Sequence, residues 1–237
     1  MNDKPLVLTE RRGPVFIVSI NRIEARNAVN GATASALLAA FKEFEHADAL
    51  KVAVLTGVDG TFCAGADLKA IGTEHSNAIE HTGRADGPMG PSRLQLDKPV
   101  IAAVSGHAVA GGLELACWCD LRVADESAVF GVFCRRWGVP LVDGGTVRLP
   151  RLIGHSRAMD MILTGRAVNA EEALEIGLVN RLVTETDALS AAVALGDEIA
   201  QFPEMCRRAD RRSAIVQWSL DIDEALIQEG AGGYEVA

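Results

Sequence analysis

Two stretches of buried-strand sequence, each followed directly by a glycine-rich turn, constrain the fold of this chain more than any other feature. KVAVLTG (51–57) leads into TFCAGADLKA (61–70), and PVIAAVSG (99–106) leads into HAVAGGLELA (107–116). Both strands are continuous apolar runs, which is typical of strands buried on both faces of a parallel sheet. In open α/β sheets, ligands bind at turns of this kind. The sequence therefore predicts an α/β protein with a site where these two turns meet.

The sequence around the turns predicts two strand–helix–strand units. LVLTE and VFIVSI, around the turn RRGP, predict a hairpin over residues 5 to 20. The stretch TASALLAAFKEFEHAD has Leu37, Leu38, Phe41 and Phe44 at helical spacing, so a helix is expected to cross from the hairpin to the strand at 51–57. GGLELACWCD predicts a short helix, and LRVAD predicts the strand that completes the second unit.

The rest of the chain is less regular. Residues 72–98 contain several glycines and prolines without sustained periodicity, and predict a mobile flap with some helix. Beyond residue 145 helical patterns dominate, with LVNRLV as a strand and a break at Pro203. EGAGGYEVA, at the end, carries no helical pattern and is expected to fray. We expect a core domain over residues 1–185 and a C-terminal helical region over residues 186–237.

Composition excludes several classes of protein. The formal charge of −9 argues against general nucleic-acid binding. The apolar runs are too short or too rich in glycine for a membrane helix, and MNDKPLVL lacks the apolar region of a signal peptide, so we expect a cytoplasmic protein without membrane contact. Five cysteines, an odd number, fit a reducing compartment. Cys117 and Cys119 have no second ligand pair, so we interpret them as buried thiols rather than zinc ligands.

Backbone amides in the two glycine-rich turns are the first candidates for chemistry. Gly65 permits a sharp turn, and a helix expected to begin near Asp67 would leave the Ala66 amide free. Gly111 and Gly112 precede a helix, so their amides point along its positive end. Two such amides that converge would form an oxyanion hole. Taken alone, a turn of this kind is more often structural, and neither matches the dinucleotide fingerprint or the P-loop.

Together with their flanking motifs, the two turns resemble those of the crotonase (enoyl-CoA hydratase/isomerase) superfamily, and the resemblance covers nearly the whole chain. The matching segments are NRIEARNAV, FCAGADLK, GHAVAGGLELA, AVFG and LTGRAVNAEEALEIGLVNRLV. The resemblance implies a spiral of ββα units with a C-terminal helical region, and an acyl-CoA thioester whose oxygen is held by the Ala66 and Gly111 amides. It implies substrate or CoA contacts from Arg26, Ala64, Ala66, Asp67, Leu68, Lys69 and Gly111. It also implies a homotrimer or a dimer of trimers, with the C-terminal helical region at 186–237 in the contacts. The chemistry needs no metal or redox cofactor, because coenzyme A is part of the substrate.

Glu114 is the candidate general acid/base. It follows Gly111 by three residues, so on a helix its side chain lies roughly one turn from that amide. A glutamate on a helix more often faces solvent. Here Leu113, Leu115 and Trp118 are apolar neighbours, so burial with a raised pKa is expected. The resemblance aligns Glu114 with one of the two catalytic glutamates of the hydratases.

The second hydratase glutamate is absent. Cys134 occupies its position, and we interpret the thiol as a packing residue, with a nucleophile or a weak acid as alternatives. Asp143, nine residues later, lies where members with isomerase chemistry carry a carboxylate. It is a candidate second acid/base, or the cap of a helix that begins near Gly145. His75 and His81, on the flap, are expected to be solvated.

The sequence thus predicts a lyase of the enoyl-CoA hydratase type, which adds water across a 2-enoyl-CoA double bond. Glu114 is the principal acid/base and Asp143 assists it. One alternative is a double-bond isomerase, or other enolate chemistry, on the same platform. Another, suggested by Cys134, is a non-catalytic homologue that binds acyl-CoA. The last is a generic α/β domain that binds a different anion. Acyl-chain length, pathway and exact oligomer are not set by the sequence.

Overall fold

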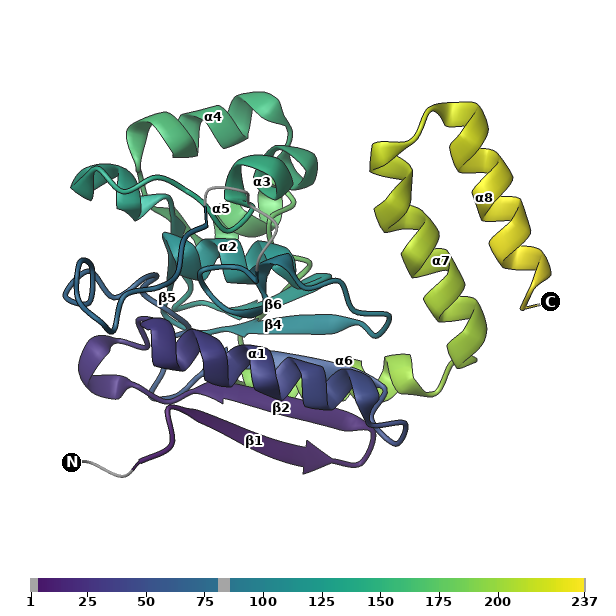
Figure 1. Cartoon of the computed structure of the whole chain (residues 1–237), viewed down its shortest axis with the longest axis horizontal. Helices are drawn as coiled ribbons and strands as arrows, with labels where there is room; N and C mark the ends of the chain where they lie inside the picture. The colour runs from purple at the N-terminus through teal and green to yellow at the C-terminus, as the bar shows by residue number, and fades with distance from the viewer. Residues whose placement is uncertain (1–3, 81–85, 237) are drawn as a thin grey trace.

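The structure, a computed structural model, describes residues 4–80 and 86–236. Its frame is a six-stranded sheet in the order β1-β2-β3-β4-β6-β9 (Figure 1). β1 (Val7–Arg12) and β2 (Val15–Ile20) form the predicted antiparallel hairpin. From β2 onward the neighbours are parallel. The remaining strands are β3 (Val52–Gly57), β4 (Val100–Val104), β6 (Leu121–Asp125) and β9 (Arg181–Val183).

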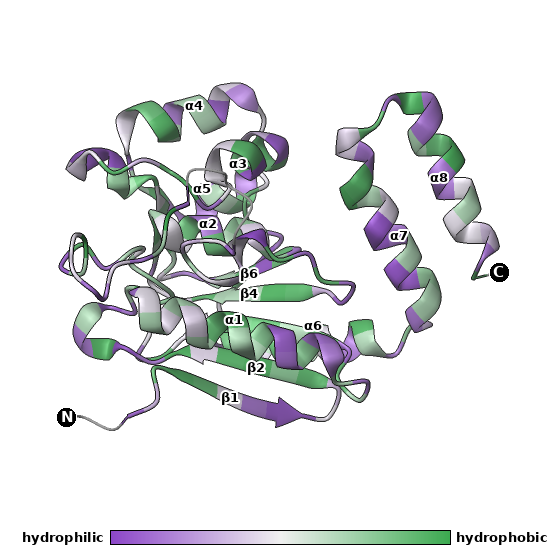
Figure 2. Ribbon diagram, in the orientation of Figure 1, coloured by the Kyte–Doolittle hydropathy of each residue, from purple (hydrophilic) through white to green (hydrophobic). Residues whose placement is uncertain are grey.

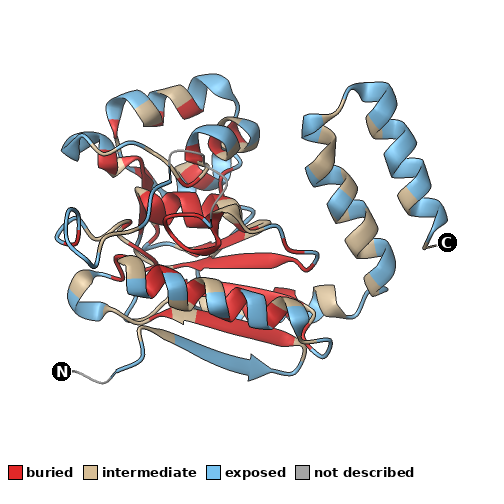
Figure 3. Ribbon diagram, viewed as in Figure 1, coloured by how far each residue is buried: buried red, intermediate tan, exposed pale blue. Residues whose placement is uncertain are grey.

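Side chains of the central strands alternate between two apolar cores. On β2, Phe16 and Val18 point into one core, and Val15 and Ile17 point into the other, as the period of two along a strand requires. α1 (Gly31–His46) packs in the first core and α6 (Ala188–Ala200) packs in the second. Because both faces are covered, the central strands are buried along almost their whole length (Figure 3) and read as apolar runs (Figure 2).

Side-chain caps set where both covering helices begin. The Asn30 side chain accepts a hydrogen bond from the Thr33 amide at 3.0 Å and starts α1. The Asp187 side chain does the same for the Ser190 amide at 2.8 Å and starts α6. Each cap satisfies one of the amides that the first helical turn leaves without a partner.

A three-stranded sheet lies beside the first. It has the order β5-β7-β8, with β5 (His107–Val109), β7 (Val129–Gly131) and β8 (Val168–Asn169). β5 follows β4 directly and leads into α2 (Gly111–Trp118), while β7 follows β6. An isolated bridge between Cys63 and Ala108 connects the turn after β3 to β5. The repeated order of two strands and a helix is the predicted ββα unit.

Short helices fill the space beyond α2. They are α3 (Gly145–Ile153), α4 (His155–Thr164) and α5 (Ala170–Glu175), with 3-10 turns η1 (Ile23–Ala25), η2 (Pro91–Arg93) and η3 (Phe133–Trp137). Within the described ranges, no helix has the length and apolar character that a membrane crossing requires.

Two C-terminal helices form an antiparallel pair at the side of the molecule (Figure 1). They are α7 (Glu204–Val216) and α8 (Ile222–Tyr234), joined by η4 (Gln217–Ser219). Arg211 of α7 pairs with Asp120 at 2.9 Å and thereby ties α7 to the body. α8 is almost entirely exposed (Figure 3).

Two predicted details of secondary structure are wrong. The C-terminal residues were expected to fray, but α8 runs to Tyr234, because Asp221 caps its start and each glycine in a helix costs only about 1 kcal/mol. No helix begins near Asp67, where residues 68–72 form successive turns. Of the predicted flap, the described parts contain one 3-10 turn, Pro91–Arg93, and His81 lies outside the described residues.

Candidate active site

The turn after β3 runs between two neighbouring segments, and its Ala66 amide donates no hydrogen bond to any residue that the structure describes. The Cys63 amide donates to the His107 carbonyl at 2.8 Å, on the β5 side. On the other side, the Val29 amide donates to the Gly65 carbonyl at 2.8 Å. The carbonyl and the amide of one trans peptide point in opposite directions, so the Ala66 N–H points away from Val29. This peptide plane orients the Ala66 amide, in place of the helix expected near Asp67.

The Gly111 amide lies at the N-terminus of α2, close to the Gly65 backbone. The Ala110 carbonyl accepts from the Glu114 amide at 3.2 Å within the helix, so the Gly111 N–H points outward from the helix end. A Cβ placed on Gly65 would lie 3.0 Å from the Gly111 nitrogen and 2.8 Å from the Ala110 Cβ. Gly65 also has a φ of +98°. Only glycine therefore allows the two predicted oxyanion turns to touch.

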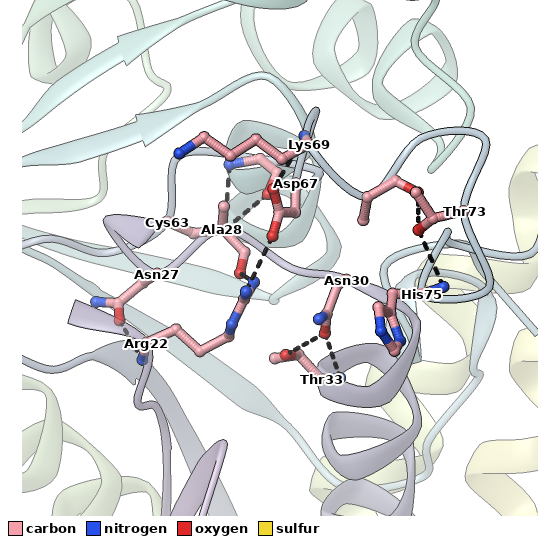
Figure 4. A network of polar contacts seen from close by, with 12 residues as sticks. Arg22, Asn27, Ala28, Asn30, Thr33, Cys63, Asp67, Lys69, Thr73 and His75 are labelled. Carbon is pink, nitrogen blue, oxygen red and sulfur yellow. Dashed lines mark hydrogen bonds and ion pairs between the residues drawn. The ribbon is translucent and has the colours of Figure 1, made fainter. Parts of the chain in front are cut away.

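Asp67 holds this loop in place through Arg22, as Figure 4 shows. An Arg22 Nη2 to Asp67 Oδ2 ion pair of 2.9 Å joins the loop to the segment after β2. The same guanidinium donates to the Ala28 carbonyl, and Asp67 Oδ1 accepts from the Lys69 amide at 3.1 Å. The side chain of Asp67, a predicted substrate contact, is thus occupied by Arg22.

The other predicted CoA-contacting residues line the outer side of the loop. The Ala64 amide donates to the Arg26 carbonyl at 3.1 Å, which joins the two segments. Arg26 has a left-handed backbone, with φ of 52°, and its side chain is exposed. Leu68 and Lys69 are exposed as well. Arg26 and Lys69 therefore place two positive charges at the surface of an acidic protein.

Glu114 is buried on α2, as predicted. Its Oε1 accepts hydrogen bonds from the Asp143 and Gly145 amides, both at 2.8 Å. A Cβ on Gly145 would lie 2.9 Å from Glu114 Cγ, so the glycine leaves room for the carboxylate. Burial raises the pKa of Glu114 to about 7, against the lowering effect of the Gly145 amide and with a further increase from the Asp143 charge. A carboxyl group in this range can both donate and accept a proton near neutral pH.

Asp143 is buried beside Glu114, in the loop before α3. Its Oδ1 accepts hydrogen bonds from the Met89 amide at 2.8 Å and from the Ser92 hydroxyl. Burial raises the pKa of Asp143, while the bonds from Ser92 and Met89 oppose the rise. The alternative interpretation as a helix cap is wrong: α3 has no side-chain cap, and its Gly145 amide is bound by Glu114.

Cys134 is buried in η3, near Glu114. Burial raises the pKa of its thiol, and the Glu114 charge raises it further. The adjacent Arg135 and Arg136 side chains donate to the carbonyls of Ile162 and Gly165. The thiol is therefore disfavoured as a thiolate nucleophile, which supports its interpretation as a packing residue.

Residues 89–92 also reach the site, which sequence reasoning missed. Met89 is fully buried, and a Cβ on Gly111 would lie 2.9 Å from its sulfur, so Met89 packs against the N-terminus of α2. Ser92 is also fully buried. No local sequence pattern marks either residue, because both act through hydrogen bonds to Asp143, which lies 54 residues after Met89 and 51 residues after Ser92. The His75 side chain, by contrast, is exposed.

Comparison with known proteins shows the family of the chain. The family model described as enoyl-CoA hydratase/isomerase matches residues 10–218. The chain belongs to the enoyl-CoA hydratase/isomerase family. Among similar relatives, enoyl-CoA hydratase EchA19 of Mycobacterium tuberculosis is 39% identical over 216 residues, which cover 88% of this chain and 80% of the relative. The short-chain-enoyl-CoA hydratase of Clostridium acetobutylicum is 36% identical, over 94% of this chain and 86% of the relative.

Solved structures of the family share the fold of the chain. An enoyl-CoA hydratase from Mycobacterium tuberculosis H37Rv superposes with a TM-score of 0.90 at 38% identity, covering 97% of this chain and 89% of that one. A carnitinyl-CoA dehydratase from Mycobacterium avium 104 superposes with a TM-score of 0.82 at 37% identity, over 97% and 92% of the two chains. The predicted crotonase fold is confirmed.

Proposed function

We propose that this family member is an enoyl-CoA hydratase, with Glu114 as its principal acid/base. The observation that carries the proposal is the buried Glu114 carboxyl, whose pKa is raised to about 7 and whose neighbour is a second buried carboxyl, Asp143. Both groups lie next to the N-terminus of α2. The named hydratase relatives support the reaction class.

The oxyanion chemistry depends on two backbone amides. When water adds at Cβ of a 2-enoyl thioester, negative charge moves to the thioester oxygen. The outward-pointing amides of Ala66 and Gly111, held in contacting turns, are the proposed donors to that oxygen. Fixed donors favour the enolate over the neutral thioester, and each contributes about 3 kcal/mol to lowering the barrier.

In the proposed reaction one carboxyl group acts as the general base and the other as the general acid. In the proposed reaction Asp143 holds the water and takes its proton as the oxygen bonds to Cβ, and Glu114 delivers a proton to Cα. After the product leaves, Asp143 releases its proton to water and Glu114 takes one up from water, which restores the starting protonation. The chemistry needs neither a metal nor a redox cofactor. Arg26 and Lys69 are proposed to attract the anionic CoA, whose charge is opposite to theirs.

Assembly and location are further parts of the proposal. By resemblance, copies of the chain form a trimer or a dimer of trimers, with contacts from the C-terminal helical region at 186–237 beyond the core domain at 1–185. The free state of the five cysteines fits a reducing compartment, which supports the cytoplasm as the place of action.

A double-bond isomerase is the second candidate, because Cys134 replaces the usual second glutamate. Purified protein incubated with a 2-enoyl-CoA removes the conjugated chromophore if it is a hydratase. With a 3-enoyl-CoA, an isomerase generates that chromophore. Glu114→Gln is the matched control and is expected to lose about a thousandfold in kcat. Acyl-CoA binding by calorimetry with no turnover of either substrate would contradict catalysis and favour a binding protein.

A further inference from the structure

A short segment of the chain before β4 is fixed to the loop that carries Asp143. The Arg93 side chain donates to the Val142 carbonyl at 2.9 Å. From the other side, Arg148 of α3 donates to the Ser92 carbonyl at 2.8 Å and to the Asp143 carbonyl at 2.9 Å. These backbone contacts fix the position of Ser92 independently of its hydroxyl group.

The hydroxyl group of Ser92 has one partner in this network. Ser92 is fully buried, and its Oγ–H donates to Asp143 Oδ1, the same oxygen that the Met89 amide binds. A Cβ on Gly87 would lie 1.8 Å from Ser92 Oγ, so glycine at 87 is required for this side-chain position. Among the described residues, the hydrogen bonds that the Asp143 carboxylate accepts end on Oδ1. Its second oxygen, Oδ2, is left for other partners.

We propose that Ser92 is a positioning residue for the reaction: its hydroxyl holds Asp143 Oδ1 so that the carboxylate stays ionised, with Oδ2 directed to water or substrate. This inference rests on the proposed function, in which Asp143 assists Glu114. A buried carboxylate is unfavourable unless hydrogen bonds replace its lost water. Ser92 supplies one of two such bonds, and a hydrogen bond to an ionised group is stronger than one between neutral groups.

Replacing Ser92 tests the hydroxyl alone, because its backbone contacts with Arg148 remain. The first readout is the titration of the Asp143 carboxyl by carbon-13 NMR, which needs no turnover. In Ser92→Ala the midpoint is expected to rise, since the ionised form loses a donor. The charged or titratable groups that act on Asp143, namely Glu114, Arg93, Arg148 and Cys63, are the same in both proteins.

The second readout is the pH profile of hydration. The acidic limb of kcat/KM is expected to move to higher pH in Ser92→Ala, and kcat to fall about tenfold with little change in KM. Ser92→Cys keeps the shape of the side chain and a weaker donor. Its kcat and the acidic limb of its kcat/KM profile are expected to lie between those of the wild type and of Ser92→Ala. Ser190→Ala is the matched control, because it removes a similar hydroxyl-to-carboxylate bond, to Asp187, at the exposed start of α6.

A double variant separates positioning from a purely structural role. In an Asp143→Asn background the Ser92→Ala change is expected to have almost no further effect on kcat, since both act through one carboxylate. An unshifted Asp143 titration in Ser92→Ala would overturn the proposal. So would an equal loss at every pH, or the same fractional loss in the Asp143→Asn background. Failure of the wild type to turn over enoyl-CoA would instead overturn the proposed function, and the titration would still decide the role of Ser92.

Discussion

At the scale of single residues, Glu114 carries a stability cost that its chemistry explains. Its carboxyl group titrates near 4.5 in an unfolded chain and at about 7 in the folded protein. A group whose folded pKa is raised contributes stability that is present below the unfolded pKa and is lost as pH rises through the folded pKa. The native state therefore becomes less stable between these two values, because the carboxyl group ionises freely in the unfolded chain while burial keeps it protonated in the folded protein. Active sites commonly accept such a cost in return for activity.

Glu114→Gln is expected to be more stable than the wild type above neutral pH. The amide keeps an oxygen that accepts from Asp143 and Gly145, but it never ionises. The two proteins should have similar free energies of unfolding near pH 4. By about pH 8 the free energy of unfolding of the variant should exceed that of the wild type by about 3 kcal/mol. Urea unfolding across this range measures the difference. Glu229→Gln, on the exposed face of α8, should show no such trend, and a flat difference for Glu114→Gln would contradict burial of the charge.

At the scale of elements, a buried lysine terminates α1. Lys98 is 1% exposed, and its ammonium donates to the Phe44 carbonyl at 3.0 Å and to the Ala47 carbonyl at 2.8 Å. It also lies 5.2 Å from the centre of the Phe44 ring. The last carbonyls of a helix need partners, and a cation at this end also interacts favourably with the helix dipole. Lys98 thus connects the helix that covers one face of the sheet to the start of β4.

Lys98→Met is expected to lower the free energy of unfolding by about 3 kcal/mol. Methionine fills the space but removes one donor from each of the two carbonyls, which keep only their bonds from the Ala47 and Leu50 amides, and it removes the charge that faces the helix end. Lys42→Met, an exposed lysine on the same helix, is the matched control and should change stability by less than about 0.5 kcal/mol. Urea denaturation of both variants measures the difference. Equal effects in the two variants would show that Lys98 does not cap the helix.

The elements themselves were mostly predictable, because their signals are local. The apolar run VFIVSI reflects burial on both faces of a strand, and the helical spacing of Leu37 and Phe41 reflects burial on one face of a helix. Prediction failed where local signals compete. At Asp67 the loop is held by Arg22, 45 residues away, and no helix forms. In α8 the glycines suggested an end, but the Asp221 cap and packing against α7 sustain the helix.

At the scale of the whole molecule, the candidate site is assembled from segments that lie far apart in the sequence. The burial of Glu114 was predictable because its sequence neighbours on the helix are apolar. The predicted pair of Glu114 and Asp143 is joined by a hydrogen bond between one side chain and the other residue's backbone amide. Ser92 and Met89 were not predictable, since a hydroxyl and a backbone amide become ligands of a carboxylate only after the sheet has brought them together.

The C-terminal helices expose apolar residues that a single copy leaves uncovered. On α8, Ile222 and Ile227 are each 72% exposed and Leu226 is 57% exposed, and Trp218 of η4 is 56% exposed. Apolar side chains scattered singly over a surface need no explanation, but Ile222 and Leu226 are four residues apart and so share one face of the helix, and an exposed apolar face is typical of an interaction surface. These residues lie in the region that we propose forms the contacts of a trimer or a dimer of trimers.

Ile222→Glu combined with Leu226→Glu is expected to convert a trimer to monomers while each copy stays folded. Glutamate at 222 suits the helix N-terminus, and the repulsion between glutamates at 222 and 226 costs only about 0.5 kcal/mol, so the helix itself should persist. Desolvating two charges in a contact would oppose assembly. Light scattering gives the mass and circular dichroism the helix content, with Gln228→Glu as a control that adds charge to α8 without removing an apolar side chain. A double variant with the mass of the wild type would place the contact on another surface, because charges buried there could not be tolerated.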